Sequence, residues 1–278
     1  MIWLLVDIGN TRVKWARLVD GRMGKQHAAA NTGWKSEQYA RRVIGRTWPR
    51  GRGEDRIVVS SVAADQINRW LIAAARQSGA PTPEFVTSQR SAAGVTTEYL
   101  DPWRLGVDRF VGAIGAHHLS SGQPVCVANV GTAMTLDLID GMGKHRGGAI
   151  VPGPALMVNS LLTKTNGIRR RATGGPNGVT SLFAKTTRTA IGQGALYAAA
   201  AVIDRAIEEA RLQLGSRPLV LLTGGGAAAI RPLIRNTAVS LPDLVLHGLA
   251  VWAQQSRPLT GNGSRPAGGV RQKQTSRK

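Results

Sequence analysis

The first fourteen residues, Met1 to Lys14, constrain the fold more than any other stretch of the chain. Ile2 to Val6 form a short apolar run, which predicts a buried strand that ends at Asp7. Gly9-Asn10-Thr11 then predicts a tight turn, because Gly and Asn tolerate the backbone geometry of turns. An extended pattern resumes from Arg12 to Leu18. The stretch therefore predicts a hairpin that presents a carboxylate, backbone N–H groups, a hydroxyl and a lysine to one small volume.

This set of groups suits a polyphosphate with a bound metal ion. Backbone amides in a turn form an anion-binding concavity, and Asn10 and Thr11 can donate hydrogen bonds to phosphoryl oxygens. Lys14 supplies positive charge, and Asp7 can hold a hard cation such as Mg²⁺. The alternative interpretation is a plain hairpin with an Asn-containing turn.

The second half of the chain repeats this pattern. Val125 to Asp137 again reads as apolar strand, polar residue, Gly-Thr turn and extended strand, and Asn129 follows Asp7 by 122 residues. A supersecondary unit repeated at half the chain length predicts two similar domains that face each other. Two such loops can hold a polyphosphate from both sides.

Between the two units, Gly106-Val-Asp-Arg109 precedes a helix expected from Phe110 to His118. Gly106 allows the backbone to approach a ligand, and the helix dipole favours Asp108 as a carboxylate. The alternative is a simple helix cap with an exposed arginine.

Elsewhere, strands and helices are expected to alternate, which predicts an α/β sheet. The expected strands are 57–62, 84–87 and 219–223, and the expected helices are 35–46, 65–77 with Asp65 as N-cap, 155–162, 187–214 and 244–253. The glycines at 224–226 follow a strand and can let the backbone lie against a flat ligand such as a purine ring.

Charge is the unusual feature of the composition, with 36 basic and 16 acidic residues and a net charge of +20. Such an excess is compatible with an anionic small molecule, a nucleic acid or an anionic surface. The basic clusters do not alternate with aromatic residues, so solvated surface charge is favoured and nucleic acid is not an expected partner. Residues 256–278 are basic, rich in polar residues and nearly free of large apolar ones, which predicts a disordered tail.

Compartment and metal chemistry follow from a few residue types. Cys126 is the only cysteine and lies in an apolar run, which predicts a small core residue in a reducing compartment. Asp7 interrupts the first apolar run too early for a signal peptide, and Ala195 to Ile203 is too short to span a bilayer. We therefore expect a cytoplasmic protein without a membrane partner. The five histidines show no metal-ligand spacing, and no Walker-type loop or nucleophile elbow is present.

Several of these motifs together resemble the type III pantothenate kinases over nearly the whole chain. They are Asp7-Ile-Gly-Asn-Thr11, Gly106-Val-Asp-Arg109, Gly131-Thr-Ala133 with Thr135, Gly147-Gly-Ala-Ile-Val-Pro-Gly153 and Thr223-Gly-Gly225. The resemblance implies an α/β fold with two ribonuclease H-like domains, as in the acetate and sugar kinase, Hsp70 and actin superfamily. On this basis we expect domains at 1–118 and 119–255, followed by the basic tail at 256–278. It also implies a homodimer.

The activity implied by the resemblance is ATP-dependent phosphorylation of pantothenate to 4′-phosphopantothenate, the first step of coenzyme A biosynthesis. Asp108 would be the catalytic base, and Asp7 would bind magnesium. The positions that match ATP contacts are Asp7, Ile8, Gly9, Asn10, Thr11, Arg12, Val13, Lys14 and Thr132. The positions that match pantothenate contacts are Tyr99, Gly106, Val107, Asp108, Arg109 and Thr187.

The chain departs from the family pattern at a few positions. Asn129 stands where an aspartate usually binds the activating monovalent cation, K⁺ or NH₄⁺; its amide oxygen can ligate a cation but brings no negative charge. Ala227 and Thr186 also replace the usual residue types. None of these departures affects Asp7 or Asp108.

Two other functions remain open from sequence. One is a catalytically weak or inactive relative that binds ATP or pantothenate and acts as a regulatory, transcription accessory protein. The other is a kinase of the same superfold with a different small alcohol as substrate, because fold alone does not fix function. The intact Gly106-Val-Asp-Arg109 motif favours pantothenate over another alcohol.

Overall fold

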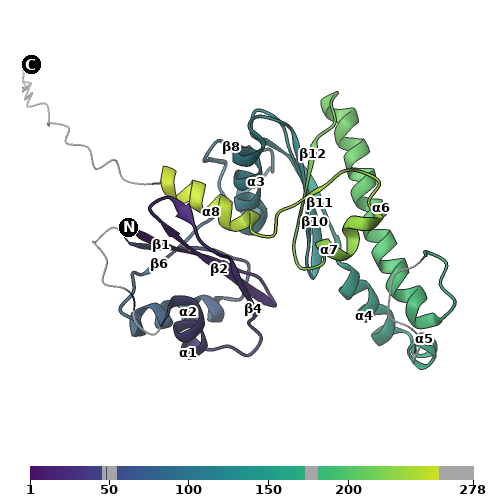
Figure 1. Cartoon of the computed structure of the whole chain (residues 1–278), viewed down its shortest axis with the longest axis horizontal. Helices are drawn as coiled ribbons and strands as arrows, with labels where there is room; N and C mark the ends of the chain where they lie inside the picture. The colour runs from purple at the N-terminus through teal and green to yellow at the C-terminus, as the bar shows by residue number, and fades with distance from the viewer. Residues whose placement is uncertain (46–47, 49–54, 173–180, 257–278) are drawn as a thin grey trace, which may run out of the picture.

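The computed structural model describes residues 1–45, 48, 55–172 and 181–256, and it contains two β-sheets (Figure 1). The first sheet has the strand order β3-β2-β1-β5-β6, with β4 also paired to β2. β1 and β2 are antiparallel, and β1 and β5 are parallel. Its strands are β1 (Ile2–Ile8), β2 (Arg12–Val19), β3 (Arg22–Met23), β4 (His27–Ala30), β5 (Arg56–Ser61) and β6 (Pro83–Phe85).

The central strand β1 is apolar along its length because both of its faces are covered. Leu4 and Val6 pack into a core with α1 (Ser36–Tyr39), the π-helical turn η1 (Ala40–Ile44) and α2 (Asp65–Gln77). Leu5 faces the other way and packs against α8 (Leu244–Gln255). A strand buried on both faces shows a continuous apolar run rather than alternation, which is the pattern of Ile2 to Val6.

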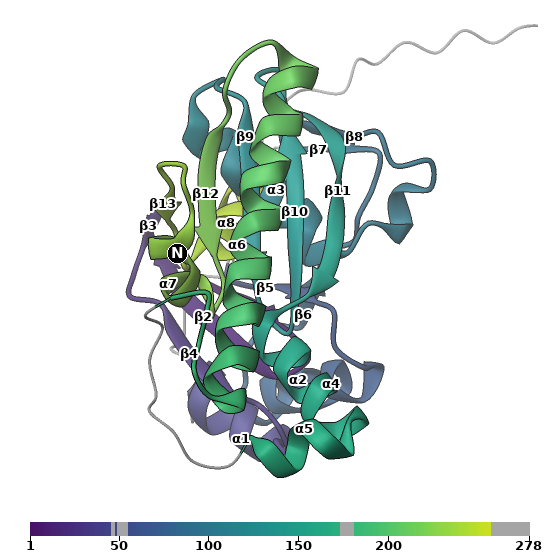
Figure 2. The same cartoon turned by 90° about the vertical axis from the view of Figure 1, so that its right-hand side faces the viewer.

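The second sheet has the order β13-β12-β9-β10-β11-β8-β7. The helix α3 (Val107–Ser120) covers one face, with Phe110 and Ile114 against Val127, and α6 (Thr187–Leu214) covers the other (Figure 2). The strands are β7 (Ser91–Ala92), β8 (Val95–Thr97), β9 (Val125–Val130), β10 (Ala133–Ile139), β11 (Lys144–Pro152), β12 (Leu219–Thr223) and β13 (Val239–Ser240).

Short helices complete the chain. Figure 1 shows α4 (Pro154–Lys164), α5 (Asn166–Arg171) and the first turns of α6 projecting together from the second sheet. The remaining elements are the 3₁₀ turns η2 (Pro102–Arg104) and η3 (Arg231–Leu233) and the helix α7 (Ala227–Ile230).

Both sheets are built around the same unit. The antiparallel hairpin β1–β2 has β5 parallel to β1, and the antiparallel hairpin β9–β10 has β12 parallel to β9. This repeat confirms the predicted α/β fold with two ribonuclease H-like units.

The chain passes between the two sheets more than once. β7 and β8 pair in the second sheet, and α8 returns to the first sheet and also packs on α3. Arg56 in β5 fixes the end of α8 with a hydrogen bond of 2.8 Å from Nη1 to the Ala253 carbonyl. The domain limits 1–118 and 119–255 remain a prediction, and residues 257–278 of the predicted tail lie outside the described residues.

Most predicted elements are present, with a few differences. The helix predicted over 35–46 is instead α1 followed by η1, and it ends at Ile44 because Gly45 adopts φ 97°. Ala64, not Asp65, is the N-cap of α2, and Asp65 lies in the first turn, where the helix dipole favours a carboxylate. The helix expected from Phe110 begins at Val107, which places Asp108 in its first turn.

Cys126 is buried as predicted. In the described ranges no helix is long and apolar enough to cross a bilayer.

Candidate active site

Asn31 forms hydrogen bonds with the backbone of the turn between β1 and β2. Within the turn, the Gly9 amide donates to the Arg12 carbonyl at 2.9 Å. The Asn31 backbone N–H donates to the Thr11 carbonyl at 3.2 Å, and its side-chain amide donates to the Gly9 carbonyl at 3.4 Å. Asn31 directly follows β4, whose pairing with β2 brings it to the turn. Asn31 was not predicted from the sequence, because its position depends on a strand pairing that the sequence does not specify.

Asp7 and Lys14 face each other across the hairpin, as predicted. They are partners in the β1–β2 register, and Lys14 Nζ also donates to the Pro242 carbonyl at 3.1 Å. Burial raises the pKa of Asp7 from 3.8 to about 6, although the nearby charge of Lys14 and the Ser60 hydroxyl act to lower it. A carboxylate whose charge is incompletely compensated by the protein has the chemistry of a cation ligand.

Asp108 lies in the first turn of α3, which begins after Gly106. Its Oδ1 accepts a hydrogen bond of 2.9 Å from the backbone N–H of Arg109, which fixes the carboxylate at the helix end. Burial raises the pKa of Asp108 above its ordinary value, and the charge of Asp137 adds to this increase. The charge of Asp108 in turn raises the pKa of Asp7. The structure thus brings the two predicted carboxylates, from β1 and α3, into one electrostatic environment.

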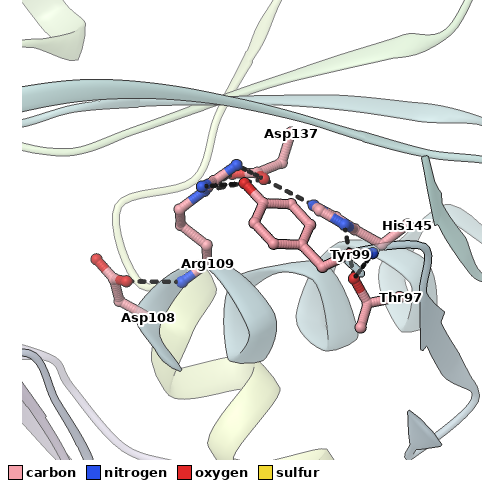
Figure 3. A network of polar contacts seen from close by, with 6 residues as sticks. All are labelled: Thr97, Tyr99, Asp108, Arg109, Asp137 and His145. Carbon is pink, nitrogen blue, oxygen red and sulfur yellow. Dashed lines mark hydrogen bonds and ion pairs between the residues drawn. The ribbon is translucent and has the colours of Figure 1, made fainter. Parts of the chain in front are cut away.

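Arg109 is buried rather than exposed, so the interpretation of a helix cap with an exposed arginine is wrong. Its side chain is 5% exposed and forms an ion pair with Asp137, with 2.7 Å between Nη2 and Oδ1. Arg109 Nη1 donates to the Tyr99 hydroxyl at 2.8 Å (Figure 3). His145 Nε2 approaches the same Asp137 oxygen at 2.7 Å. Tyr99 and Arg109, both predicted from the family resemblance, therefore meet, and Asp137 and His145 join them.

Gly148 makes room for this ion pair. A Cβ at Gly148 would overlap the Leu136 carbonyl and would lie 2.5 Å from Arg109 Nη2 and 2.9 Å from Asp137 Oδ1. This accounts for the glycine at that position of the Gly147-Gly148 motif.

The turn between β9 and β10 is one residue shorter than the first turn, and a glycine amide again closes it. The Gly131 amide donates at 3.1 Å to the carbonyl two residues on, that of Ala133, whereas the Gly9 amide donates to the carbonyl three residues on, that of Arg12. Gly153 closes on this turn, since its amide donates to the Thr132 carbonyl at 2.9 Å and a Cβ there would overlap the Gly131 carbonyl. Gly224, with φ +91°, closes on the end of β9, where a Cβ would overlap the Val130 carbonyl. The glycine motifs therefore shape one loop cluster around the second hairpin.

Asn129 stands in a row of oxygen-bearing side chains across the second sheet. It is the register partner of Thr135 on β10 and of Thr223 on β12. Its Oδ1 would lie 2.6 Å from a Cβ on Gly224. Among the described residues, the buried Thr223 Oγ1 has no hydrogen-bond partner. Amide and hydroxyl oxygens are ligands for hard cations.

Thr187 is not joined to this group by the described contacts. It is the first residue of α6, whose N-cap Thr186 accepts a hydrogen bond of 3.2 Å from the Thr189 amide. Within the described part of the chain it makes no hydrogen bond to Asp108, Arg109 or Tyr99.

Sequence comparisons relate the chain to one enzyme family. The family model of type III pantothenate kinase matches residues 3–209. A type III pantothenate kinase of Nitrosococcus oceani is 36% identical over 261 residues, which cover 91% of this chain and 94% of the relative. One of Janthinobacterium sp. (strain Marseille) is also 36% identical, over 92% of this chain and 98% of the relative.

Among solved structures, a protein described as a Baf family transcriptional activator from Campylobacter jejuni aligns with a TM-score of 0.54 and 16% identity. The alignment covers 90% of this chain and 97% of the other and shows likeness of fold alone. The sequence relatives and the family model decide the assignment: the chain belongs to the type III pantothenate kinase family.

Proposed function

We propose that the protein transfers the terminal phosphoryl group of ATP to the primary hydroxyl of pantothenate and forms 4′-phosphopantothenate. The observation that carries the proposal is the convergence of Asp7 and Asp108, because one carboxylate suits the metal-bound phosphates and the other suits the attacking hydroxyl. In phosphoryl transfer the protein mainly positions the reactants and compensates their charge.

Asp108 acts as the base in this proposal. Its carboxylate accepts the hydrogen bond of the pantothenate hydroxyl and then its proton as the new O–P bond forms and the bond from the terminal phosphorus to the bridging oxygen of ADP breaks. The Arg109 N–H group holds one carboxylate oxygen, so the carboxylate keeps one orientation toward the substrate. The raised pKa of Asp108 makes it a better proton acceptor than an ordinary aspartate.

The phosphates of ATP fit the two turns. Asn10 and Thr11 lie exposed on the first turn, and Thr132 lies exposed on the second. Lys14 contributes positive charge beside Asp7. Asp7 would hold Mg²⁺, and that ion would supply charge compensation for the phosphates during transfer.

A monovalent cation, K⁺ or NH₄⁺, fits the row of Asn129, Thr135 and Thr223. The buried Thr223 hydroxyl without a partner among the described residues supports a ligand there. Because the row contains no carboxylate, we propose that it binds the cation weakly.

A homodimer is supported by the apolar surface around α4. This helix contains Leu156, Met157, Val158, Leu161 and Leu162, yet none of its residues is buried in the single chain. Phe183, shortly before α6, is 87% exposed. A second copy of the chain can cover this surface, and Thr187 adjoins it, so we propose that Thr187 contacts pantothenate in the site of the partner protomer.

The cell compartment is also part of the proposal. We place the reaction in the cytoplasm, where ATP is available and where the single buried thiol of Cys126 stays reduced.

The test is direct detection of 4′-phosphopantothenate from ATP, Mg²⁺ and pantothenate, with other small primary alcohols as competing acceptors. Preferred turnover of pantothenate supports the proposal. Preference for another alcohol would indicate a different kinase of the same superfold.

The regulatory alternative is not favoured, because the relatives at 30–36% identity carry the name of the kinase.

A further inference from the structure

The polar contacts around Arg109 form a closed ring that starts and ends at Tyr99 (Figure 3). The Tyr99 backbone N–H donates to Thr97 Oγ1 at 3.2 Å, and Thr97 Oγ1 lies 3.3 Å from His145 Nδ1. His145 Nε2 lies 2.7 Å from Asp137 Oδ1, and Arg109 bridges Asp137 to the Tyr99 hydroxyl. The ring links four segments of the chain, namely β8 with its following loop, α3, β10 and β11.

The donors and acceptors of the ring follow from the chemistry of its members. The Asp137 carboxylate can only accept, so His145 Nε2 carries a hydrogen and donates to it. In the neutral imidazole, Nδ1 then accepts from the Thr97 hydroxyl, whose oxygen also accepts from the Tyr99 amide. Contacts on both ring nitrogens hold the His145 side chain, and contacts from His145 and Arg109 hold the Asp137 carboxylate.

Arg109 makes three hydrogen-bond contacts with Asp137 in addition to their ionic attraction. Its Nε lies 3.0 Å and 3.1 Å from the two Asp137 oxygens, and its Nη2 lies 2.7 Å from Oδ1. Bidentate contacts of this kind are among the stronger hydrogen bonds in proteins. Both side chains are at most 5% exposed, so the pair is shielded from solvent.

The ring leaves hydrogen-bond donors for a ligand. The Tyr99 oxygen accepts from Arg109, so the Tyr99 hydroxyl hydrogen remains to be donated. Asp137 compensates the charge of Arg109, so this end of the site offers directed hydrogen bonds instead of an uncompensated positive charge. Such donors select the position of a ligand oxygen, because a ligand that fails to match them leaves buried polar groups without partners.

We propose that Asp137 and His145 are positioning residues that hold Arg109 and Tyr99 in the geometry that binds pantothenate. Neither residue touches the reacting atoms, and both act through Arg109 and Tyr99. The inference rests on the proposed function for its substrate, while the ring itself rests on the contacts given above.

The first experiment compares Asp137→Asn with Asp140→Asn. Asp140 lies at the end of the same hairpin, where its carboxylate accepts from the Met142 and Lys144 amides and does not contact Arg109. For Asp137→Asn we expect KM for pantothenate to rise by about tenfold or more, because Arg109 loses a charged partner, and KM for ATP to change less than about twofold. Asp140→Asn should leave both constants near those of the wild type. Equal increases of both KM values, or an unchanged KM for pantothenate in folded Asp137→Asn, would overturn the proposal.

A milder pair of variants covers the case in which Asp137→Asn does not fold. Thr97→Val removes the hydroxyl at nearly constant volume, and Thr97→Ser keeps it. The proposal expects Thr97→Val to raise KM for pantothenate severalfold with little effect on kcat, and Thr97→Ser to restore the wild-type value. Equal KM values for the two variants would contradict it.

A measurement without turnover separates this inference from the proposed function. The Nε–H resonance of Arg109, assigned by its loss in Arg109→Lys, should exchange slowly with solvent in the wild type and in Asp140→Asn. It should exchange at least about tenfold faster in Asp137→Asn and faster in His145→Gln. Rapid exchange in the wild type would overturn the ring as a positioning device. Slow exchange together with absent pantothenate turnover would leave the ring intact and reject the substrate.

Discussion

The carboxylates of Asp7 and Asp108 come from different elements and act on each other, because the charge of Asp108 raises the pKa of Asp7. Asp7 is the next-to-last residue of the central strand of the first sheet, and Asp108 lies in the first turn of the helix that covers one face of the second sheet. Two like charges in a partly buried site are unfavourable until a cation or a donor compensates them. The repulsion between the two carboxylates is therefore present in the free protein, and we expect bound ligands to reduce it.

Asp108→Asn should retain ATP binding and lose turnover. The amide cannot accept the hydroxyl proton, so kcat is expected to fall at least about 100-fold, within the range of general base catalysis. Steady-state kinetics and calorimetric titration with ATP analogues would measure both quantities. Asp101→Asn is a suitable control because Asp101 is exposed and pairs with Arg104 outside the site. A near-normal rate for Asp108→Asn would remove Asp108 from the mechanism.

Asp7→Asn should stabilise the ligand-free protein while it abolishes turnover. The pKa of Asp7 in the folded state, about 6, lies above its ordinary value of 3.8, so the stabilising protonated form is lost as the pH rises through 6. At pH 8 the substitution should raise the free energy of unfolding by at most about 3 kcal/mol, and the gain should shrink as the pH falls toward 4. Urea denaturation at several pH values measures this. Asp20→Asn, at an exposed position, provides the control, and a gain that does not depend on pH would contradict the prediction.

Asn129→Asp should strengthen activation by potassium. The new carboxylate would add negative charge to a row that now offers only amide and hydroxyl oxygens, so half-maximal activation is expected at a several-fold lower K⁺ concentration. Turnover as a function of K⁺ concentration at constant ionic strength tests this. The exposed Asn166→Asp change controls for the added charge. The same potassium response in wild type and Asn129→Asp would mean that Asn129 does not line the cation site.

Gly148→Ala should weaken pantothenate binding by displacing Arg109. The added methyl group overlaps the Leu136 carbonyl and crowds the Arg109–Asp137 pair, so we expect a loss of about 1–3 kcal/mol in stability and an increase in KM for pantothenate. Gly194→Ala in α6 is the matched control, because a Cβ there meets nothing within 4 Å and the change favours the helix by about 0.5–1 kcal/mol. If both variants show the same KM for pantothenate, Gly148 is not required for the geometry of Arg109.

Leu161→Glu should convert the proposed homodimer to a monomer. Leu161 lies on α4, where a charge would be placed inside the interface, and Leu212→Glu near the end of α6 adds the same charge at another exposed leucine. Light scattering at micromolar concentration distinguishes the outcomes. A monomeric wild type would contradict the proposed dimer.

The fold was predictable where one segment carries its own pattern. Both hairpins were predicted from short patterns: the apolar run before Asp7 with the Gly9-Asn10-Thr11 turn, and the similar pattern around Asn129. Their repetition predicted two similar sheets. The family resemblance added Asp108, Arg109 and Tyr99 as a group.

The contacts of Arg109 with Asp137, and of Asp137 with His145, were not predictable from the sequence. Asp137 and His145 become neighbours only through the register of β10 and β11, which contains a shift between Leu138 and Ile139. Asn31 reaches the first turn only because β4 pairs with the start of β2. Strand register and side-chain ion pairs depend on the packed tertiary structure, so a single sequence gives no local signal for them.

The most direct test of the central claim is to follow ADP and 4′-phosphopantothenate together in one reaction of the purified protein with ATP, Mg²⁺ and pantothenate, with and without K⁺ or NH₄⁺. We predict that the two products form in equal amounts and that ADP formation depends on pantothenate. Formation of ADP without 4′-phosphopantothenate, or no product under any of these cation conditions, would contradict it.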